Sequence, residues 1–189
     1  MKKRKKRSFP LGVISAIIII IVTWLAVHGE VDRRIQMQIY PQEYSDYVEL
    51  YAEKYNVPTE IVYSIIHTES KFDSKARSSA GAIGLMQITP DTYDWLLYLR
   101  KEEKPGELDD VRINIDFGTY YLSYLYKKFG DYTTVFAAYN AGMNRVSSWL
   151  EDERYSQNGR LIKIPFAETE NYIKKVNNTM VKYKQLYSK

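Results

Sequence analysis

The chain has 189 residues, which leaves room for one domain and an appendage. It contains no cysteine, so disulfides, thiolate metal sites and a cysteine nucleophile are excluded. The net charge of +4 comes from the N-terminus, because six of the 27 basic residues fall within residues 2–7 and the rest of the chain carries 21 basic and 23 acidic residues. This balance argues against a nucleic-acid binder, which would carry its positive excess on the folded domain.

A long apolar run follows the basic segment. Leu11 to Val27 contains no charged residue and only Ser15 and Thr23 as polar side chains. At seventeen residues it is at the lower limit for a helix that crosses a bilayer. Its middle part, Ile17 to Val22, is apolar on all sides, whereas a core helix of a soluble domain would show a polar stripe. We therefore predict a basic cytoplasmic tail at 1–10 and a transmembrane anchor at 11–28.

The charge asymmetry around this run predicts its orientation. Basic residues stay on the cytoplasmic side, so the N-terminus is expected in the cytoplasm and the rest of the chain outside the cytoplasmic membrane. A cleaved signal peptide is the alternative, but its apolar region would be shorter. The segment Trp24–Glu30 also shows no clear small-x-small cleavage site. A polar connector at 29–40 then leads to one domain at 41–189.

From Pro41 onward the sequence predicts helices joined by short breaks. Aromatic and apolar residues at helical spacing indicate a first helix within 44–55. A second helix begins at Pro58, and its apolar residues share one stripe: Ile61, Val62, Ile65 and Ile66. Residues 78–84, Ser-Ser-Ala-Gly-Ala-Ile-Gly, are too rich in small residues for a helix and predict a turn or short hairpin.

The second half continues the helical pattern. Thr89-Pro90-Asp91 is typical of a helix start, and the charged segment 101–110 is expected to be a surface loop. A polar excursion is predicted at 151–165. The remaining predicted helices cover residues 115–129, 131–139, 145–150 and 167–187. The fold class is therefore mainly α, with one compact helical domain and a small irregular or hairpin segment.

Glu69 is the residue that says most about the function of the protein. It lies four residues after Ile65 and three after Ile66, which puts its carboxylate on the apolar stripe of the second helix. Burying a charge costs several kcal/mol unless it is paired, and a raised pKa relieves that cost. A carboxylic acid that stays protonated near neutral pH can act as a proton donor. Spacing alone leaves an alternative open, in which Glu69 reaches solvent or pairs with Lys71 or Arg77.

Four short motifs occur in order along the domain. They are Glu69-Ser-Lys-Phe72, Gly84-Leu-Met-Gln-Ile88, Ala138-Tyr-Asn-Ala-Gly142 and Glu168-Thr-x-x-Tyr172. Each is weak alone, but together they resemble the soluble lytic transglycosylase family of the lysozyme-like superfamily, over roughly Tyr44 to Tyr183. The resemblance implies an α+β lysozyme-like fold. It also implies cleavage of the β-1,4 bond between N-acetylmuramic acid and N-acetylglucosamine in peptidoglycan, with formation of a 1,6-anhydro end.

The resemblance also implies roles for individual residues. Glu69 matches the single acid/base of the family, at the end of its helix. Ser78 matches a serine that contacts the substrate near the acetamido group. Gln87 lies in the motif whose loop walls the substrate groove. From the residues alone, Gln87 could instead satisfy backbone groups of an irregular loop.

The later motifs supply three more expected substrate contacts. Tyr139 matches the aromatic residue that faces the acid, and Asn140 is its neighbour in the motif. Glu168 matches a second acid that positions the substrate without transferring a proton. The residue types leave other interpretations open, with Tyr139 as a core tyrosine and Asn140 as a partner of loop backbone.

Two other functions fit the same motifs. A muramidase would hydrolyse the same bond with water, and a wall-binding scaffold would keep the groove without turnover. The presence of Glu69 favours catalysis over the scaffold. No metal site is expected, since the chain has two histidines and no cysteine, and the reaction that the resemblance implies calls for no cofactor. The expected partners are peptidoglycan glycan strands and the membrane, with no nucleic acid, and a place in membrane-associated wall or secretion machinery is compatible with a tethered domain.

Overall fold

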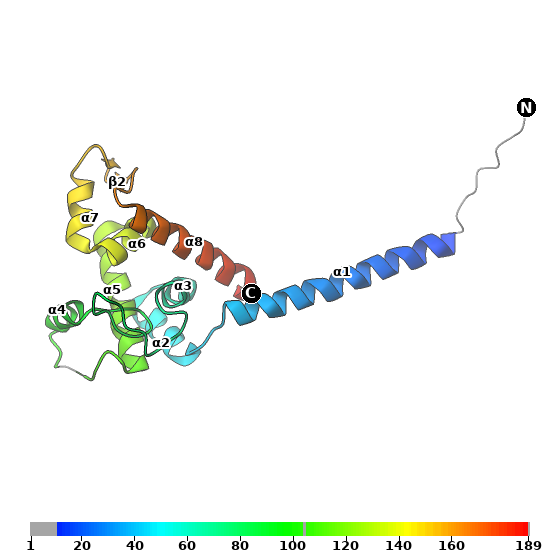
Figure 1. Ribbon diagram of the computed structural model, residues 1–189, viewed down its shortest axis with the longest axis horizontal. Coiled ribbons are helices and arrows are strands. Elements are labelled where there is room, and N and C mark those ends of the chain that lie inside the picture. The colour runs from blue at the N-terminus through cyan, green and yellow to red at the C-terminus, as the bar shows by residue number, and fades with distance from the viewer. Residues whose placement is uncertain (1–10, 104, 189) are drawn as a thin grey trace, which may run out of the picture. The chain divides into compact units, whose positions relative to one another are not determined.

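The computed structural model describes residues 11–103 and 105–188 (Figure 1). The chain divides into two units, Met1–Pro41 and Gln42–Lys189. The predicted basic tail at 1–10 lies outside the described residues. The boundary between the units falls beside the predicted start of the domain at residue 41.

The described part of the first unit is formed by helix α1, Leu11–Ile39. The predicted connector at 29–40 is therefore helical almost to its end. Large apolar side chains along α1 are exposed, among them Ile20 and Trp24. Within the described residues, no helix combines the length and the apolar character that crossing a membrane requires. The transmembrane span predicted at 11–28 is thus not supported by the structure.

The second unit is mainly helical, as predicted. Its elements are α2 (Ser45–Tyr55), α3 (Thr59–Glu69), α4 (Pro90–Arg100), α5 (Val111–Phe129), α6 (Tyr132–Ala141), α7 (Met143–Leu150), β1 (Ser156–Gln157), β2 (Arg160–Leu161) and α8 (Ala167–Tyr187). Helix α5 contacts α2, α4 and α6, and α3 packs against α8 (Figure 1). The apolar stripe of α3 lies in the core, where Ile61, Val62, Ile65 and Ile66 are at most 2% exposed.

Side-chain caps explain where several helices begin. Thr89 accepts a hydrogen bond from the backbone of Thr92, and Pro90 is the first residue of α4, as the sequence predicted. Helix α5 begins at Val111, earlier than the predicted residue 115, because Asp110 accepts a hydrogen bond from the backbone of Ile113 at 3.0 Å. The predicted polar excursion at 151–165 contains the antiparallel pair β1 and β2, which the sequence pattern did not predict.

The long connection between α3 and α4 is organised by the buried side chain of Asn114 on α5. Its Oδ1 accepts a hydrogen bond from the backbone N–H of Met86 at 2.7 Å. Its Nδ2 donates to the backbone oxygens of Ile83 at 2.9 Å and Leu108 at 2.7 Å. Gly84 is required there, because it has φ +77 and a Cβ would lie 2.4 Å from Asn114 Nδ2. One buried amide therefore fixes the loop that carries the second motif.

The same connection shows the predicted turn. Ile83 forms isolated antiparallel bridges with Arg77 and with Ile88, which agrees with the turn or short hairpin expected at 78–84. Met86 lies against Gly118 of α5, where a Cβ would come within 2.3 Å of the Met86 sulfur. The absence of a side chain at Gly118 therefore lets the loop approach the helix closely.

A buried charged cluster joins α2, α4 and α5. Asp116 is 5% exposed and accepts a hydrogen bond from the hydroxyl of Tyr55. The guanidinium of Arg100 lies 3.1 Å from Asp116 and 4.2 Å from the centre of the Phe117 ring. Arg100 is the last residue of α4, so this contact with Asp116 links the end of α4 to α5.

Asn114→Ala is expected to destabilise the folded domain by roughly 3 kcal/mol. The substitution leaves three backbone groups without their partner, and each unsatisfied buried group costs about 1–3 kcal/mol. Urea unfolding followed by circular dichroism measures the change. Asn178→Ala, at an exposed position of α8, is the matched control and should stay within about 0.5 kcal/mol of wild type. Equal effects of the two substitutions would contradict the anchoring role of Asn114.

Candidate active site

Glu69 is the last residue of α3, where the chain leaves the helix abruptly. The Ser70 hydroxyl donates to the backbone oxygen of Leu85 at 2.8 Å and so ties the helix end to the loop. Lys71 and Phe72 follow with φ values of +54 and +67, a left-handed conformation that non-glycine residues rarely adopt. The Phe72 side chain is buried in the core. These contacts fix the direction of the chain directly after Glu69.

Tyr172 of α8 is the hydrogen-bond partner of Glu69. Its hydroxyl donates to Glu69 Oε1 at 2.6 Å. Burial raises the pKa of Glu69 from 4.5 to about 7, and the hydrogen bond from Tyr172 opposes this shift. A carboxyl group with a pKa of about 7 populates both the acid and the carboxylate at neutral pH. Glu69 can therefore both donate and accept a proton.

The alternative ion pairs of Glu69 do not form. Lys71 Nζ lies 3.0 Å from His67 Nδ1, and the Arg77 guanidinium lies 3.8 Å from Asp109. The pKa of Glu69 is set by burial and by Tyr172, with no contribution from another carboxylate of the described residues. In residues 11–103 and 105–188 there is also no group of three His, Cys, Asp or Glu side chains that could hold a metal ion.

Tyr139 and Asn140 lie at the end of α6. The Tyr139 hydroxyl donates to the backbone oxygen of Met86 at 2.8 Å, and burial together with the charge of Glu69 raises the pKa of Tyr139. Asn140 Oδ1 accepts a hydrogen bond from the Thr169 hydroxyl at 2.8 Å. The electrostatic influence of Glu69 thus reaches Tyr139, but Tyr172 is the tyrosine that donates to the acid.

Gln87, Tyr139 and Asn140 line one pocket. The pocket has a volume of about 250 Å³ and also includes Tyr121 and Thr92. Gln87 has φ +48, and its Nε2 donates to the backbone oxygens of Gly84 at 2.9 Å and Ala76 at 3.2 Å. The Gln87 amide therefore satisfies backbone oxygens of its loop, which is the alternative interpretation that the residue type left open. Gln87 also lines the pocket.

Ser78 and Glu168 are exposed and lie outside that pocket. The Ser78 hydroxyl accepts a hydrogen bond from the backbone of Ala82 at 3.0 Å, within its own turn. Glu168 lies in the first turn of α8, four residues before Tyr172, so the two side chains share one face of the helix. Glu168 therefore lies one helical turn before the residue that donates to Glu69, whereas Ser78 lies in the turn that its own hydrogen bond with Ala82 closes.

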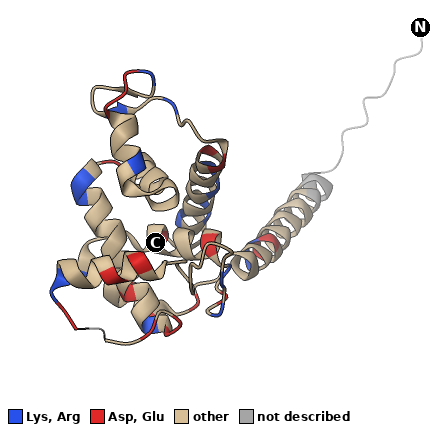
Figure 2. Cartoon of the chain, turned by 60° about the vertical axis from the view of Figure 1, so that its left-hand side comes forward, with Lys and Arg blue, Asp and Glu red and all other residues tan. Residues whose placement is uncertain are grey.

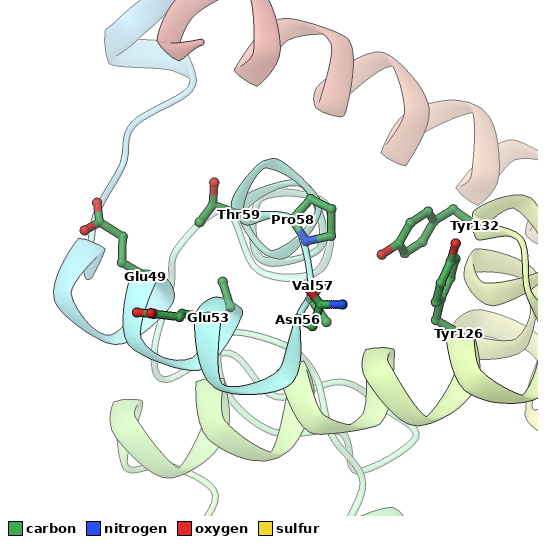
Figure 3. A pocket seen from close by; sticks show the side chains of 9 residues that line it. Glu49, Glu53, Asn56, Val57, Pro58, Thr59, Tyr126 and Tyr132 are labelled. Carbon is green, nitrogen blue, oxygen red and sulfur yellow. The ribbon is translucent and has the colours of Figure 1, made fainter. Parts of the chain in front are cut away.

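A larger pocket, of about 560 Å³, lies at the other end of α3. Figure 3 shows Glu49 and Glu53 on one side of it and Tyr126 and Tyr132 on the other. None of the predicted site residues lines this pocket. It lies where α3 begins, and Glu69 is where α3 ends. Pocket size alone therefore does not locate the candidate site.

Two residues of the site carried only faint sequence signals. Tyr172 belongs to a quoted motif, but nothing in its spacing predicts a hydrogen bond to a residue 103 positions earlier. Asn114 is a polar residue flanked by Ile113 and Ile115, all buried on α5. An amide in the middle of an apolar segment was the one signal that it satisfies buried backbone groups.

Glu69→Gln is expected to stabilise the domain increasingly as the pH rises. The pKa of Glu69 is raised from 4.5 in the unfolded chain to about 7 in the folded one, so its protonated form favours folding below pH 4.5. That contribution is lost as the pH rises through 7, while the neutral Gln does not titrate. Urea unfolding of both proteins should show a difference that grows by about 3 kcal/mol across this range.

Tyr172→Phe tests whether the hydrogen bond from Tyr172 lowers the pKa of Glu69. It removes the hydrogen bond that lowers the pKa of Glu69, so the pKa should rise further. An NMR titration of the Glu69 side-chain carbon measures it directly. An unchanged or lower pKa in the Phe variant would show that the hydrogen bond does not stabilise the carboxylate.

Several known proteins are similar to this chain in sequence. The soluble lytic murein transglycosylase of Escherichia coli K12 is 37% identical over 144 residues, covering 72% of this chain and 22% of that protein. The membrane-bound lytic murein transglycosylase C of Haemophilus ducreyi is 27% identical over 187 residues, covering 86% of this chain and 50% of that protein. The chain thus spans between about a fifth and a half of the length of these relatives.

Solved structures of lytic transglycosylases are also similar to this chain. The crystal structure of the 70-kDa soluble lytic transglycosylase of Escherichia coli matches with a TM-score of 0.70 and 32% identity, over 79% of this chain and 25% of that one. This likeness confirms the resemblance to the lysozyme-like soluble transglycosylases. The family model of the Transglycosylase SLT domain matches residues 46–162, which is more than half of the chain. The chain therefore belongs to the Transglycosylase SLT domain family.

Proposed function

We propose that this protein is a peptidoglycan lytic transglycosylase with Glu69 as its single acid and base. The observation that carries the proposal is the buried Glu69 carboxyl, with a pKa of about 7 and one hydrogen bond from Tyr172. A general acid/base works best when its pKa lies near the working pH. The names of the relatives, lytic murein transglycosylases, support the same reaction.

The proposed reaction breaks the bond between N-acetylmuramic acid and N-acetylglucosamine. Protonated Glu69 gives its proton to the glycosidic oxygen as the bond to C1 of muramic acid breaks. The resulting oxocarbenium-like or oxazolinium intermediate is favoured by the 2-acetamido group. The Glu69 carboxylate then takes the proton of the sugar's own 6-hydroxyl, whose oxygen bonds to C1 and closes the 1,6-anhydro ring.

One carboxylate is sufficient for this reaction. Glycosidases that use two carboxylates hold them about 5 Å apart for retention, or more widely for inversion, to supply a nucleophile or activate water. Here the nucleophile belongs to the substrate, so its effective concentration is high. The names of the relatives, lytic murein transglycosylases, favour this mechanism over hydrolysis.

We propose the remaining predicted residues as substrate contacts. Tyr139, Asn140 and Gln87 would line the groove beside the acid, since they share one pocket and the charge of Glu69 reaches Tyr139. Glu168, one turn before Tyr172, would position the strand, and Ser78 would reach the acetamido group from its exposed turn. For Gln87 the proposed contribution is the shape of the groove wall, since its amide nitrogen already donates to two backbone oxygens.

Glu69→Gln should lower wall cleavage by at least about 100-fold, because the amide cannot deliver or recover a proton. Mass spectrometry of fragments released from purified wall should show that wild-type products end in 1,6-anhydromuramic acid, lighter by one water than a reducing end. Glu170→Gln is the matched control, since Glu170 is exposed and pairs with Lys174. Reducing ends would indicate a hydrolase, and full activity of the Glu69→Gln variant would refute the assignment of Glu69.

We further propose that the N-terminal segment attaches the enzyme to the cytoplasmic membrane, with the domain outside. The basic residues at 2–7, the uncharged run Leu11–Val27 and the exposed apolar side chains of α1 support this orientation. A relative from Haemophilus ducreyi is named membrane-bound. A tethered wall-cutting domain would suit local wall opening by membrane-associated machinery.

Protease treatment of wall-stripped intact cells tests this topology. The domain at 41–189 should be degraded in intact cells, because it lies outside the membrane in the proposed orientation. A cytoplasmic marker protein that stays intact is the control for lysis. Protection of the domain until the cells are lysed would reject the orientation.

A further inference from the structure

Helix α8 carries two buried hydroxyl groups one turn apart. Thr169, in its first turn, is 1% exposed and lies between the exposed acids Glu168 and Glu170 (Figure 2). Tyr172 follows three residues later, about 4.5 Å along the helix, so the two side chains share the buried face of α8. Because the Tyr172 hydroxyl donates to Glu69 at 2.6 Å, Thr169 lies one turn before the residue that bonds the acid.

The Thr169 hydroxyl reaches across to α6, which contacts α8. It donates a hydrogen bond to Oδ1 of Asn140 at 2.8 Å. Asn140 is half-buried and lines the pocket of about 250 Å³ that Gln87 and Tyr139 also line. One helix, α8, therefore holds both the acid and this pocket amide through side-chain hydrogen bonds.

The hydrogen bond from Thr169 fixes the orientation of the Asn140 amide. A buried hydroxyl needs an acceptor for its proton, and within residues 11–103 and 105–188 the partner of the Thr169 hydroxyl is Oδ1 of Asn140. An amide turned the other way would present N–H groups to the hydroxyl and remove this acceptor. Asn140 Nδ2 forms no hydrogen bond with the described residues and is not a buried atom, so it is left to donate to a ligand.

The fixed orientation matters for one kind of substrate group. A sugar hydroxyl both donates and accepts hydrogen bonds, so it could bind to either end of an amide. A carbonyl oxygen only accepts, so it requires the N–H end. Every sugar of the proposed substrate carries such an oxygen in its 2-acetamido group.

We propose that Thr169 is a positioning residue, which holds the Asn140 amide so that Nδ2 donates a hydrogen bond to the acetamido oxygen of a bound sugar. The inference rests on the proposed function. It makes Asn140 a hydrogen-bond donor and names the substrate group that accepts. It also gives the buried Thr169 hydroxyl a role in the recognition of N-acetylated strands.

Binding to a variant without turnover tests the inference. Calorimetric titration of Glu69→Gln with N-acetylated wall strands gives a dissociation constant, and the titration is repeated with Thr169→Val, Thr169→Ser or Asn140→Asp added. Thr169→Val removes the hydroxyl, whereas Asn140→Asp keeps the bond from Thr169 but presents an oxygen in place of Nδ2. Both should weaken binding about fivefold, the scale of one hydrogen bond. Thr169→Ser keeps the hydroxyl and should bind as Glu69→Gln alone.

Thr134→Val is the matched control. Thr134 lies on α6 and is 1% exposed, and its hydroxyl has no hydrogen-bond partner within the described residues. The substitution is the same chemical change in an equally buried place, so the affinity should not change. The same loss of affinity in Thr134→Val would show that removing any buried hydroxyl disturbs the groove, and would overturn the inference.

Strands whose acetyl groups have been removed distinguish the acetamido oxygen from the sugar hydroxyls. Thr169→Val should not change the affinity for these strands, and an equal loss on both kinds of strand would overturn the inference. A double-mutant cycle tests whether Thr169 acts through Asn140. Thr169→Val should cost no further affinity once Asn140→Ala is present. Additive losses would refute the positioning role.

These binding results are separate from the proposed reaction. A loss of affinity of about fivefold that depends on the acetyl groups supports the contact even if wild-type products carry reducing ends. Unchanged affinity in Thr169→Val and Asn140→Asp would refute the contact even if the 1,6-anhydro products are found.

Discussion

The hydrogen bond from Tyr172 to Glu69 is the interaction on which the site depends. It joins the end of α3 to α8 across 103 residues of sequence. Two opposite effects act on one carboxyl group: burial raises its pKa and the phenol hydroxyl lowers it, with a result of about 7. Elsewhere along the same helix pair, Tyr63 stacks on Tyr183 with ring centres 5.2 Å apart. The packing of α3 on α8 therefore sets the proton affinity of Glu69.

The site also depends on the loop between α3 and α4. This loop has little regular structure of its own, so contacts from the helices must hold it in place. Asn114 satisfies its buried backbone, and the missing side chain at Gly118 lets Met86 lie against α5. The hydroxyls of Ser70, at the end of α3, and Tyr139, on α6, bond its backbone oxygens. Side chains of α5, α6 and the end of α3 therefore hold this segment in place without a helix or extended sheet of its own.

The sequence by itself determined the helices and the position of the acid. The apolar stripe from Ile61 to Ile66 follows from the spacing of neighbouring residues, and the helix start at Thr89 follows from local capping. The placement of Glu69 at the end of a buried helix follows from the same local spacing. The early start of α5 at Val111 and the strand pair β1–β2 were missed, because a cap at Asp110 and a two-residue pairing leave little periodic signal. Only the tertiary structure shows which tyrosine donates a hydrogen bond to Glu69. It also shows that Asn114 holds the loop between α3 and α4. Those contacts join residues far apart in the chain, and helical spacing gives the face of a residue but not the partner that packs against it.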